Sequence, residues 1–162
     1  MSAKETELAK AAENNELQTM ERLIAEGVSA DAKNGDGRPA LALAAIEGHL
    51  DALEVLQRHG ASLDATSSGG TTALMFAARW GKADCAEALL KGGADKDTAM
   101  DNGCTALHLA AMYGHLECAR VLVRARADRA KKNEYGKTAL ELARKEGKAE
   151  VAALLEQADA DV

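Results

Sequence analysis

Apolar residues of this chain fall in short runs that are separated by polar turns, and the same arrangement returns along the chain. One apolar run covers 73–78 and stops before Gly81, a second covers 85–90 and stops before Gly93, and a polar loop leads to Gly103. The pattern is repeated at 106–111 and 118–123. Short apolar runs closed by glycine are typical of short helices. The pattern predicts a mostly α-helical chain in which helix pairs are joined by projecting turns.

Three series of glycines share one spacing of 33 residues. They are Gly37, Gly70, Gly103 and Gly136, then Gly48, Gly81, Gly114 and Gly147, then Gly27, Gly60 and Gly93. A fixed period of this length indicates a stacked repeat array. We expect a single domain over 1–162 with repeats at about 4–36, 37–69, 70–102, 103–135 and 136–162, the first and last acting as caps.

Two departures from the glycine series predict left-handed backbone at non-glycine residues. Asn15 stands where later repeats carry a helix-ending glycine, and asparagine is the usual substitute there. Arg126 stands where Gly27, Gly60 and Gly93 end the second helix of their repeats. Helix starts are also marked, because Thr138 and Glu141 have the spacing of a capping box.

The repeated segments resemble the ankyrin repeat family over nearly the whole chain. The best copy is Gly103-Cys-Thr-Ala-Leu-His-Leu-Ala-Ala-Met-Tyr-Gly-His115, and Leu-Leu-x-x-Gly-Ala-Asp follows the preceding copy at 89–95. Alanine replaces the proline that the family often carries at the helix start. The resemblance implies an all-α solenoid of five helix-turn-helix repeats with projecting β-turn loops. It also implies a non-catalytic module that binds a protein or peptide in its concave groove.

Composition agrees with this interpretation and narrows the setting. Apolar residues make up 47% of the 162 residues and aromatic residues only 2%, so alanine and leucine must fill the core. The chain has no long apolar run, from which we expect neither a membrane span nor a signal peptide. We therefore expect a cytoplasmic or nuclear protein that is monomeric on its own.

Cysteine and histidine offer the only candidate chemistry. Cys104, His108, His115 and Cys118 could be imagined as a zinc or nucleophile site, but paired C-x-x-C spacing is missing. The resemblance implies that both histidines bond to backbone groups instead. We interpret Cys85 and Cys118 as small core residues and expect Cys104, at a turn, to be exposed. The prediction is no metal, no cofactor and no enzymatic activity.

The few aromatic residues mark a candidate binding surface. Trp80 and Tyr113 are 33 residues apart, at a position where other repeats carry Glu47 and Glu146, so we expect solvent exposure. Aromatic residues, arginine and methionine are enriched at protein interfaces. The resemblance implies that the groove and its loop tips are lined by Arg79, Trp80, Met112, Tyr113, Tyr135, Ile46, Arg38 and Asn102. The alternative is that both rings only cover the neighbouring alanine-rich helix.

Charge is distributed unevenly along the chain. Residues 1–119 carry 10 Lys/Arg against 18 Asp/Glu, residues 120–148 carry 10 against 4, and residues 149–162 add 4 acids. One hypothesis for this block is a second contact surface for an acidic partner at Arg120, Arg124, Arg126 and Arg129, and the alternative is a solvated face. The short basic block and the net charge of −6 argue against nucleic acid. A competing hypothesis is a scaffold subunit that contacts its assembly through the helix backs, meaning the helix surfaces that face away from the concave groove, or through the basic block at residues 120–148.

Overall fold

A computed structural model describes residues 2–161, which form ten α-helices and one short 3-10 turn. The helices are α1 (Ala3–Glu13), α2 (Leu17–Ala25), α3 (Ala40–Glu47), α4 (Leu50–Arg58), α5 (Ala73–Trp80), α6 (Ala83–Lys91), α7 (Ala106–Tyr113), α8 (Leu116–Arg124), α9 (Ala139–Lys145) and α10 (Ala149–Ala160). The turn η1 covers Ser68–Gly70. None of the helices within 2–161 is long and apolar enough to cross a membrane.

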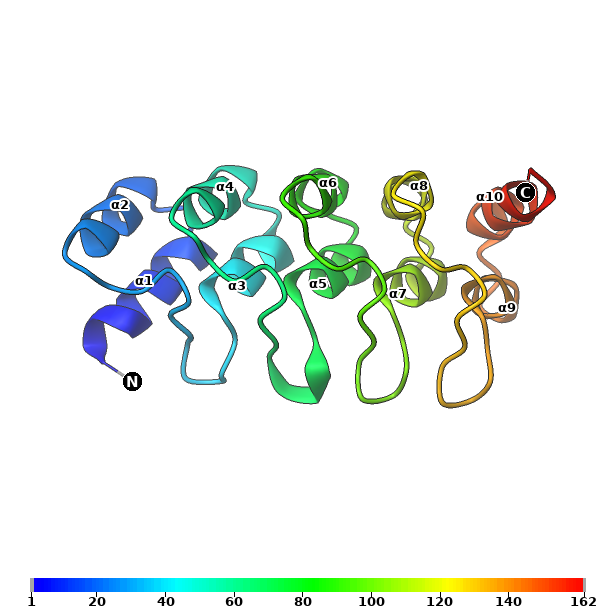
Figure 1. Cartoon of the computed structure of the whole chain (residues 1–162), viewed down its shortest axis with the longest axis horizontal. Helices are drawn as coiled ribbons and strands as arrows, with labels where there is room; N and C mark the ends of the chain where they lie inside the picture. The colour runs from blue at the N-terminus through cyan, green and yellow to red at the C-terminus, as the bar shows by residue number, and fades with distance from the viewer. Residues whose placement is uncertain (1, 162) are drawn as a thin grey trace.

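The helices stack as five antiparallel pairs (Figure 1). The odd-numbered helices form one row, the even-numbered helices form a second row, and hairpin-like loops project beyond the first row. This arrangement confirms the predicted all-α solenoid of five helix-turn-helix repeats. The limits of the single domain, 1–162, and the capping role of its end repeats stay predictions, and residues 1 and 162 lie outside the described residues.

Local sequence signals set the helix starts. In repeats two to five the first helix begins at the alanine that replaces the family's proline. The Oγ1 atom of Thr138 accepts a hydrogen bond from the Glu141 amide at 3.3 Å, and the Glu141 carboxylate accepts one from the Thr138 amide at 3.0 Å. The predicted capping box is therefore confirmed. The second helices start two residues earlier than expected, since one residue, such as Lys82, suffices to reverse the chain after Gly81.

Both predicted left-handed residues are confirmed. Asn15 has a φ of 59° and Arg126 a φ of 62°, and they are the non-glycine residues with positive φ within the described chain. The glycines that they replace also have positive φ, for example 80° at Gly60. The backbone of the repeat is thus kept even where its usual residue is lost.

The core is a column of leucines beside stacked alanines. One leucine from each second helix is fully buried, at 33-residue intervals: Leu23, Leu56, Leu89, Leu122 and Leu155. Alanines of the first helices, such as Ala44 and Ala110, are also fully buried and let neighbouring helices approach closely. The apolar pattern of the second helices predicts that Leu89, Leu90, Val121 and Leu122 all face inward. This is wrong for Leu90 and Val121, which are only partly buried.

Hydrogen bonds between neighbouring loops stiffen the projecting side of the array. A carboxylate in one loop accepts a bond of 2.7–2.9 Å from a backbone amide in the next loop, for the pairs Asp31 and Ser62, Asp64 and Asp95, and Asp97 and Asp128. The loop tips are joined as well, because the amide of Glu134 donates to the carbonyl of Asn102 at 2.9 Å. The loops therefore form a connected row rather than independent hairpins.

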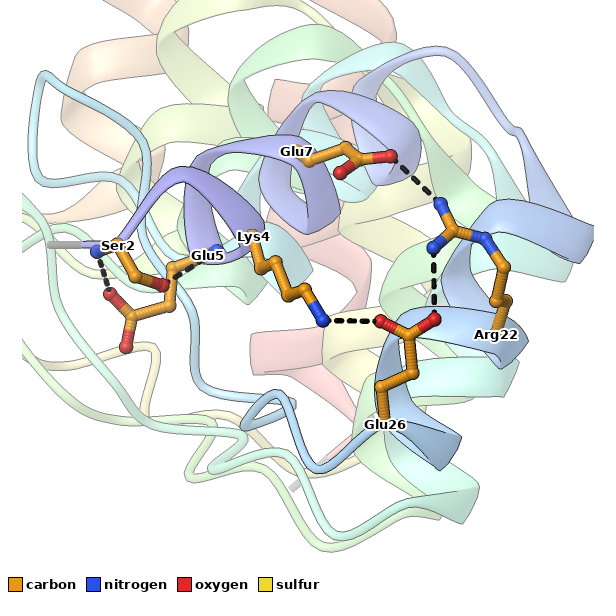
Figure 2. Close-up of polar contacts among 6 residues, drawn as sticks. All are labelled: Ser2, Lys4, Glu5, Glu7, Arg22 and Glu26. Carbon is orange, nitrogen blue, oxygen red and sulfur yellow. Dashed lines mark hydrogen bonds and ion pairs between the residues drawn. The ribbon is translucent and has the colours of Figure 1, made fainter.

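Ion pairs join the two helices at the amino-terminal end of the array (Figure 2). Glu26 pairs with Lys4 at 2.7 Å and with Arg22 at 3.1 Å, and Arg22 also pairs with Glu7 at 2.8 Å. Hydrogen bonds from Lys4 and Arg22 lower the pKa of Glu26. Ser2 caps the start of α1 in the same region. These groups are exposed, so each pair contributes little by itself.

Candidate functional site

Two aromatic residues stand at the carboxyl ends of neighbouring first-row helices. Trp80 is the last residue of α5 and Tyr113 the last residue of α7, and each is followed by a left-handed glycine. Trp80 is 51% exposed and Tyr113 41% exposed. The predicted exposure of these positions is confirmed, and the acidic residues that occupy the same position in other repeats, Glu47 and Glu146, are exposed too.

Arg79 connects the two aromatic residues. Its Cζ atom lies over both rings, 5.5 Å from the centroid of Trp80 and 5.3 Å from that of Tyr113. Cation–π contacts of this kind contribute about 0.5–1 kcal/mol at exposed sites. Three side chains from two repeats therefore form one exposed group, which we call the Arg79 cluster.

The backbone beneath the cluster is held by the next repeat. The Nε2 atom of His115 donates a hydrogen bond of 2.8 Å to the carbonyl of Arg79. The imidazole ring packs so closely on Gly81 that an added Cβ would lie 2.7 Å from its Nδ1 atom. This geometry confirms the expected structural role of His115 and explains why glycine is needed at 81.

The other predicted groove residues divide into two sets. Ile46 and Met112 occupy the position of Arg79 in their own repeats and are half-buried beside it in the stack. Arg38, Asn102 and Tyr135 lie on the loops, and within residues 2–161 no hydrogen bond, ion pair or cation–π contact joins them to the Arg79 cluster. The structure thus brings part of the predicted set together and leaves the loop residues apart.

The loop residues differ in what they present. Tyr135 is 77% exposed at the last loop tip, where its amide and that of Lys137 bond to the Asn133 side chain at 3.0 Å. A hydrogen bond with Glu134 raises the pKa of the Tyr135 phenol. Asn102 is half-buried and accepts a bond from the Cys104 amide, so it shapes its own loop.

Part of the predicted basic surface is neutralised within the fold. Arg129 pairs with Asp159 of α10 at 3.4 Å, and Arg120 pairs with Glu117 one turn earlier in α8 at 3.2 Å. Arg124 and Arg126 are exposed and make no ion pair within the described residues. The surface that remains for an acidic partner is therefore smaller than the sequence indicates.

The expected exposure of Cys104 is wrong. Cys104 is only 3% exposed, because the following loop covers it and the side-chain Nδ2 atom of Asn133 donates a hydrogen bond to its sulfur at 3.7 Å. Burial raises the pKa of the Cys104 thiol. Cys85 and Cys118 are buried as predicted, and burial raises the pKa of each thiol to about 11. Thiols of this kind are poor nucleophiles.

His108 is enclosed and fully bonded. Its Nδ1 atom accepts a hydrogen bond of 3.0 Å from the Thr105 amide, and its Nε2 atom donates one of 3.0 Å to the carbonyl of Lys137 in the next repeat. Burial lowers the pKa of the imidazole. Among residues 2–161, no three His, Cys, Asp or Glu side chains are grouped closely enough to hold a metal ion.

Sequence reasoning missed an outer groove between α4 and α6. The groove has a volume of about 1040 Å³, with Leu50 and Val55 among its apolar lining and Asp51, Asp84 and Lys91 among its charged lining. The sequence does contain a hint of this surface, since Asp51 and Asp84 occupy the same position in successive repeats, 33 residues apart. The depth of the groove, however, depends on how the helices pack.

The structure and its repeat geometry agree with the comparisons to known proteins. The family model for ankyrin repeats, in three copies, matches residues 8–100 and 92–162. No curated protein matches the chain. The two matched segments span nearly all of the chain, and the helix pairs lie at the repeat spacing throughout them. The chain therefore belongs to the ankyrin repeat family.

Proposed function

We propose that this chain is a non-catalytic interaction module that binds a protein or peptide in a concave groove centred on the Arg79 cluster. Ankyrin repeats are generally protein–protein interaction modules. The observation that carries the proposal is the cluster itself, an exposed tryptophan, tyrosine and arginine held together across α5 and α7.

The distribution of aromatic residues supports this proposal. The chain has four aromatic residues, and Trp80, Tyr113 and Tyr135 are exposed while Phe76 is half-buried. Aromatic side chains are usually buried in the core to a large extent, yet alanine and leucine fill the core of this protein. Tryptophan, tyrosine and arginine dominate the energetic centres of interfaces. Aromatic surface that the core does not need is best explained by a partner.

Rigidity is the second argument for the same surface. The contacts of Arg79 with both rings and the bond from His115 restrict the cluster before any partner arrives. A surface that is ordered beforehand loses less conformational entropy on binding. Side chains that only covered the neighbouring helix would not need such an arrangement.

The test is capture of a binding partner by the purified chain and by the Trp80→Ala/Tyr113→Ala variant. Each substitution should weaken binding by about 1–3 kcal/mol, the usual range at an interface centre. The Arg144→Ala/Glu156→Ala variant is the control, because it changes two exposed side chains that pair with each other in the last repeat, away from the Arg79 cluster. Binding by the aromatic double variant that is as strong as binding by the control variant would refute the proposal.

The outer groove between α4 and α6 supports a second candidate, a scaffold subunit that contacts its assembly through the helix backs. Its apolar and charged lining lies on the opposite row of helices from the Arg79 cluster. This candidate predicts that Asp51→Lys/Asp84→Lys removes an interaction that Trp80→Ala/Tyr113→Ala leaves intact. Three buried, reduced cysteines fit the cytoplasm or nucleus under either candidate.

A further inference from the structure

Arg79 is the arginine whose guanidinium lies over aromatic rings instead of pairing with a carboxylate. Arg22, Arg58, Arg120, Arg129 and Arg144 each pair with a carboxylate. Arg79 is exposed and has no ion pair or side-chain hydrogen bond within the described residues. Of the arginines left without a carboxylate, it is the one held over two aromatic rings.

The two rings prepare the guanidinium for a particular kind of ligand. The guanidinium lies over both rings, while its N–H donors make no bond to the described protein. A planar guanidinium offers paired donors that match the two oxygens of a carboxylate, and such bidentate bonds are the stronger class of hydrogen bond. The arrangement is suited to an acceptor supplied from outside the chain.

Neighbouring charges limit what that ligand can be. Glu47 and Glu146 are exposed at the positions that match Trp80 and Tyr113 in the flanking repeats. Neither glutamate makes an ion pair within residues 2–161. A run of acidic residues, or a doubly charged phosphate, along this row would be repelled on both sides of Arg79, whereas one carboxylate at the centre would not.

We infer, resting on the proposed function, that the partner supplies a single aspartate or glutamate side chain to Arg79. An apolar side chain next to this residue packs on the exposed faces of Trp80 and Tyr113. The surrounding segment of the partner is neutral or basic, which suits Glu47 and Glu146.

The experiment is selection from a displayed library of random 12-residue peptides on the folded chain, followed by titration of a selected synthetic peptide. Selected peptides should share one acidic residue beside an apolar one, and replacing that acid by its amide should weaken binding about tenfold, the scale of a charge-assisted bond. Arg79→Gln should cause a similar loss. Arg79→Lys should also bind more weakly, since lysine keeps the charge but lacks the fork.

Further variants distinguish failure of the carboxylate inference from failure of the proposed binding surface. Arg144→Gln, which removes an exposed arginine of the last repeat that is already paired with Glu156, should leave the affinity unchanged. Peptides that need Trp80 and Tyr113 but carry no acid, or that bind Arg79→Lys as well as the unaltered chain, would overturn the carboxylate inference alone. Peptides that bind Trp80→Ala/Tyr113→Ala as well as the unaltered chain would overturn the proposed function.

Discussion

Arg126→Gly is expected to stabilise the protein, although it removes a charged side chain and adds a flexible residue. Arg126 sits in left-handed backbone with a φ of 62°, at the position that glycine occupies in three earlier repeats. Its side chain is exposed and makes no ion pair within the described residues, so few favourable contacts are lost. The hydrogen bond of 2.9 Å from its backbone N–H to the carbonyl of Val123 can also be made by glycine.

The magnitude follows from two opposing terms. A Cβ atom in left-handed backbone costs about 1–2 kcal/mol. Glycine gives the unfolded chain more freedom, which costs about 0.4–1 kcal/mol. The difference leaves a net stabilisation of about 0.5–1 kcal/mol, which corresponds to an increase in Tm of about 1–4 °C for a chain of this size.

The assay is urea unfolding followed by circular dichroism, with thermal unfolding as a second measurement. Gly60→Arg is the matched reverse change, because Gly60 has a φ of 80° and an added Cβ would meet no atom within 4 Å. It should destabilise the chain by about 0.5–1 kcal/mol, because the same two terms act with opposite sign. The pair thus isolates the conformational cost from collisions with neighbouring atoms.

Destabilisation by Arg126→Gly would refute the strain argument and show that the Arg126 side chain makes a favourable contribution. Stabilisation accompanied by weaker partner binding would instead identify the basic block as a second contact surface. Strain that is retained at one repeat and absent from its neighbours is often found at functional positions. Stabilisation with unchanged binding would assign Arg126 no role in recognition.

Four further results are expected. Leu89→Ala should cost about 2–5 kcal/mol of unfolding free energy because Leu89 is fully buried, and equal destabilisation by Trp80→Ala in the same urea titration would place Trp80 in the core. Thiol-reactive dye should label all three cysteines slowly in the native protein at pH 8 and quickly in urea, and fast native labelling of Cys104 would contradict its burial. Burial lowers the pKa of His108, so the unfolded chain takes up a proton first as the pH falls below about 6.5. Stability should therefore drop between pH 7 and pH 5, and the drop should be smaller in His108→Gln. Elemental analysis should find no stoichiometric zinc, whereas a one-to-one content that disappears in Cys104→Ser would show a metal site.

The exposure of Trp80 and Tyr113 could be predicted because another repeat places glutamate at the same position, and a position that accepts glutamate faces water. The exposure of Cys104 was wrongly predicted because its position was judged from its own turn. It is the following loop, through Asn133 some 29 residues later, that covers the thiol. Burial that arises from a neighbouring repeat leaves no mark in the local sequence.

The sequence by itself determined the repeat period, the helix starts at alanine after a capping threonine, and the left-handed backbone at Asn15 and Arg126. These features depend on backbone chemistry within a few residues, so the order of residues is sufficient. The tertiary structure alone decided that Arg79 lies over both rings and that α10 neutralises Arg129. The contacts of Arg79 with Tyr113 and of Arg129 with Asp159 join residues about one repeat apart. Their geometry depends on the rotation and spacing between stacked helix pairs, which no single repeat encodes.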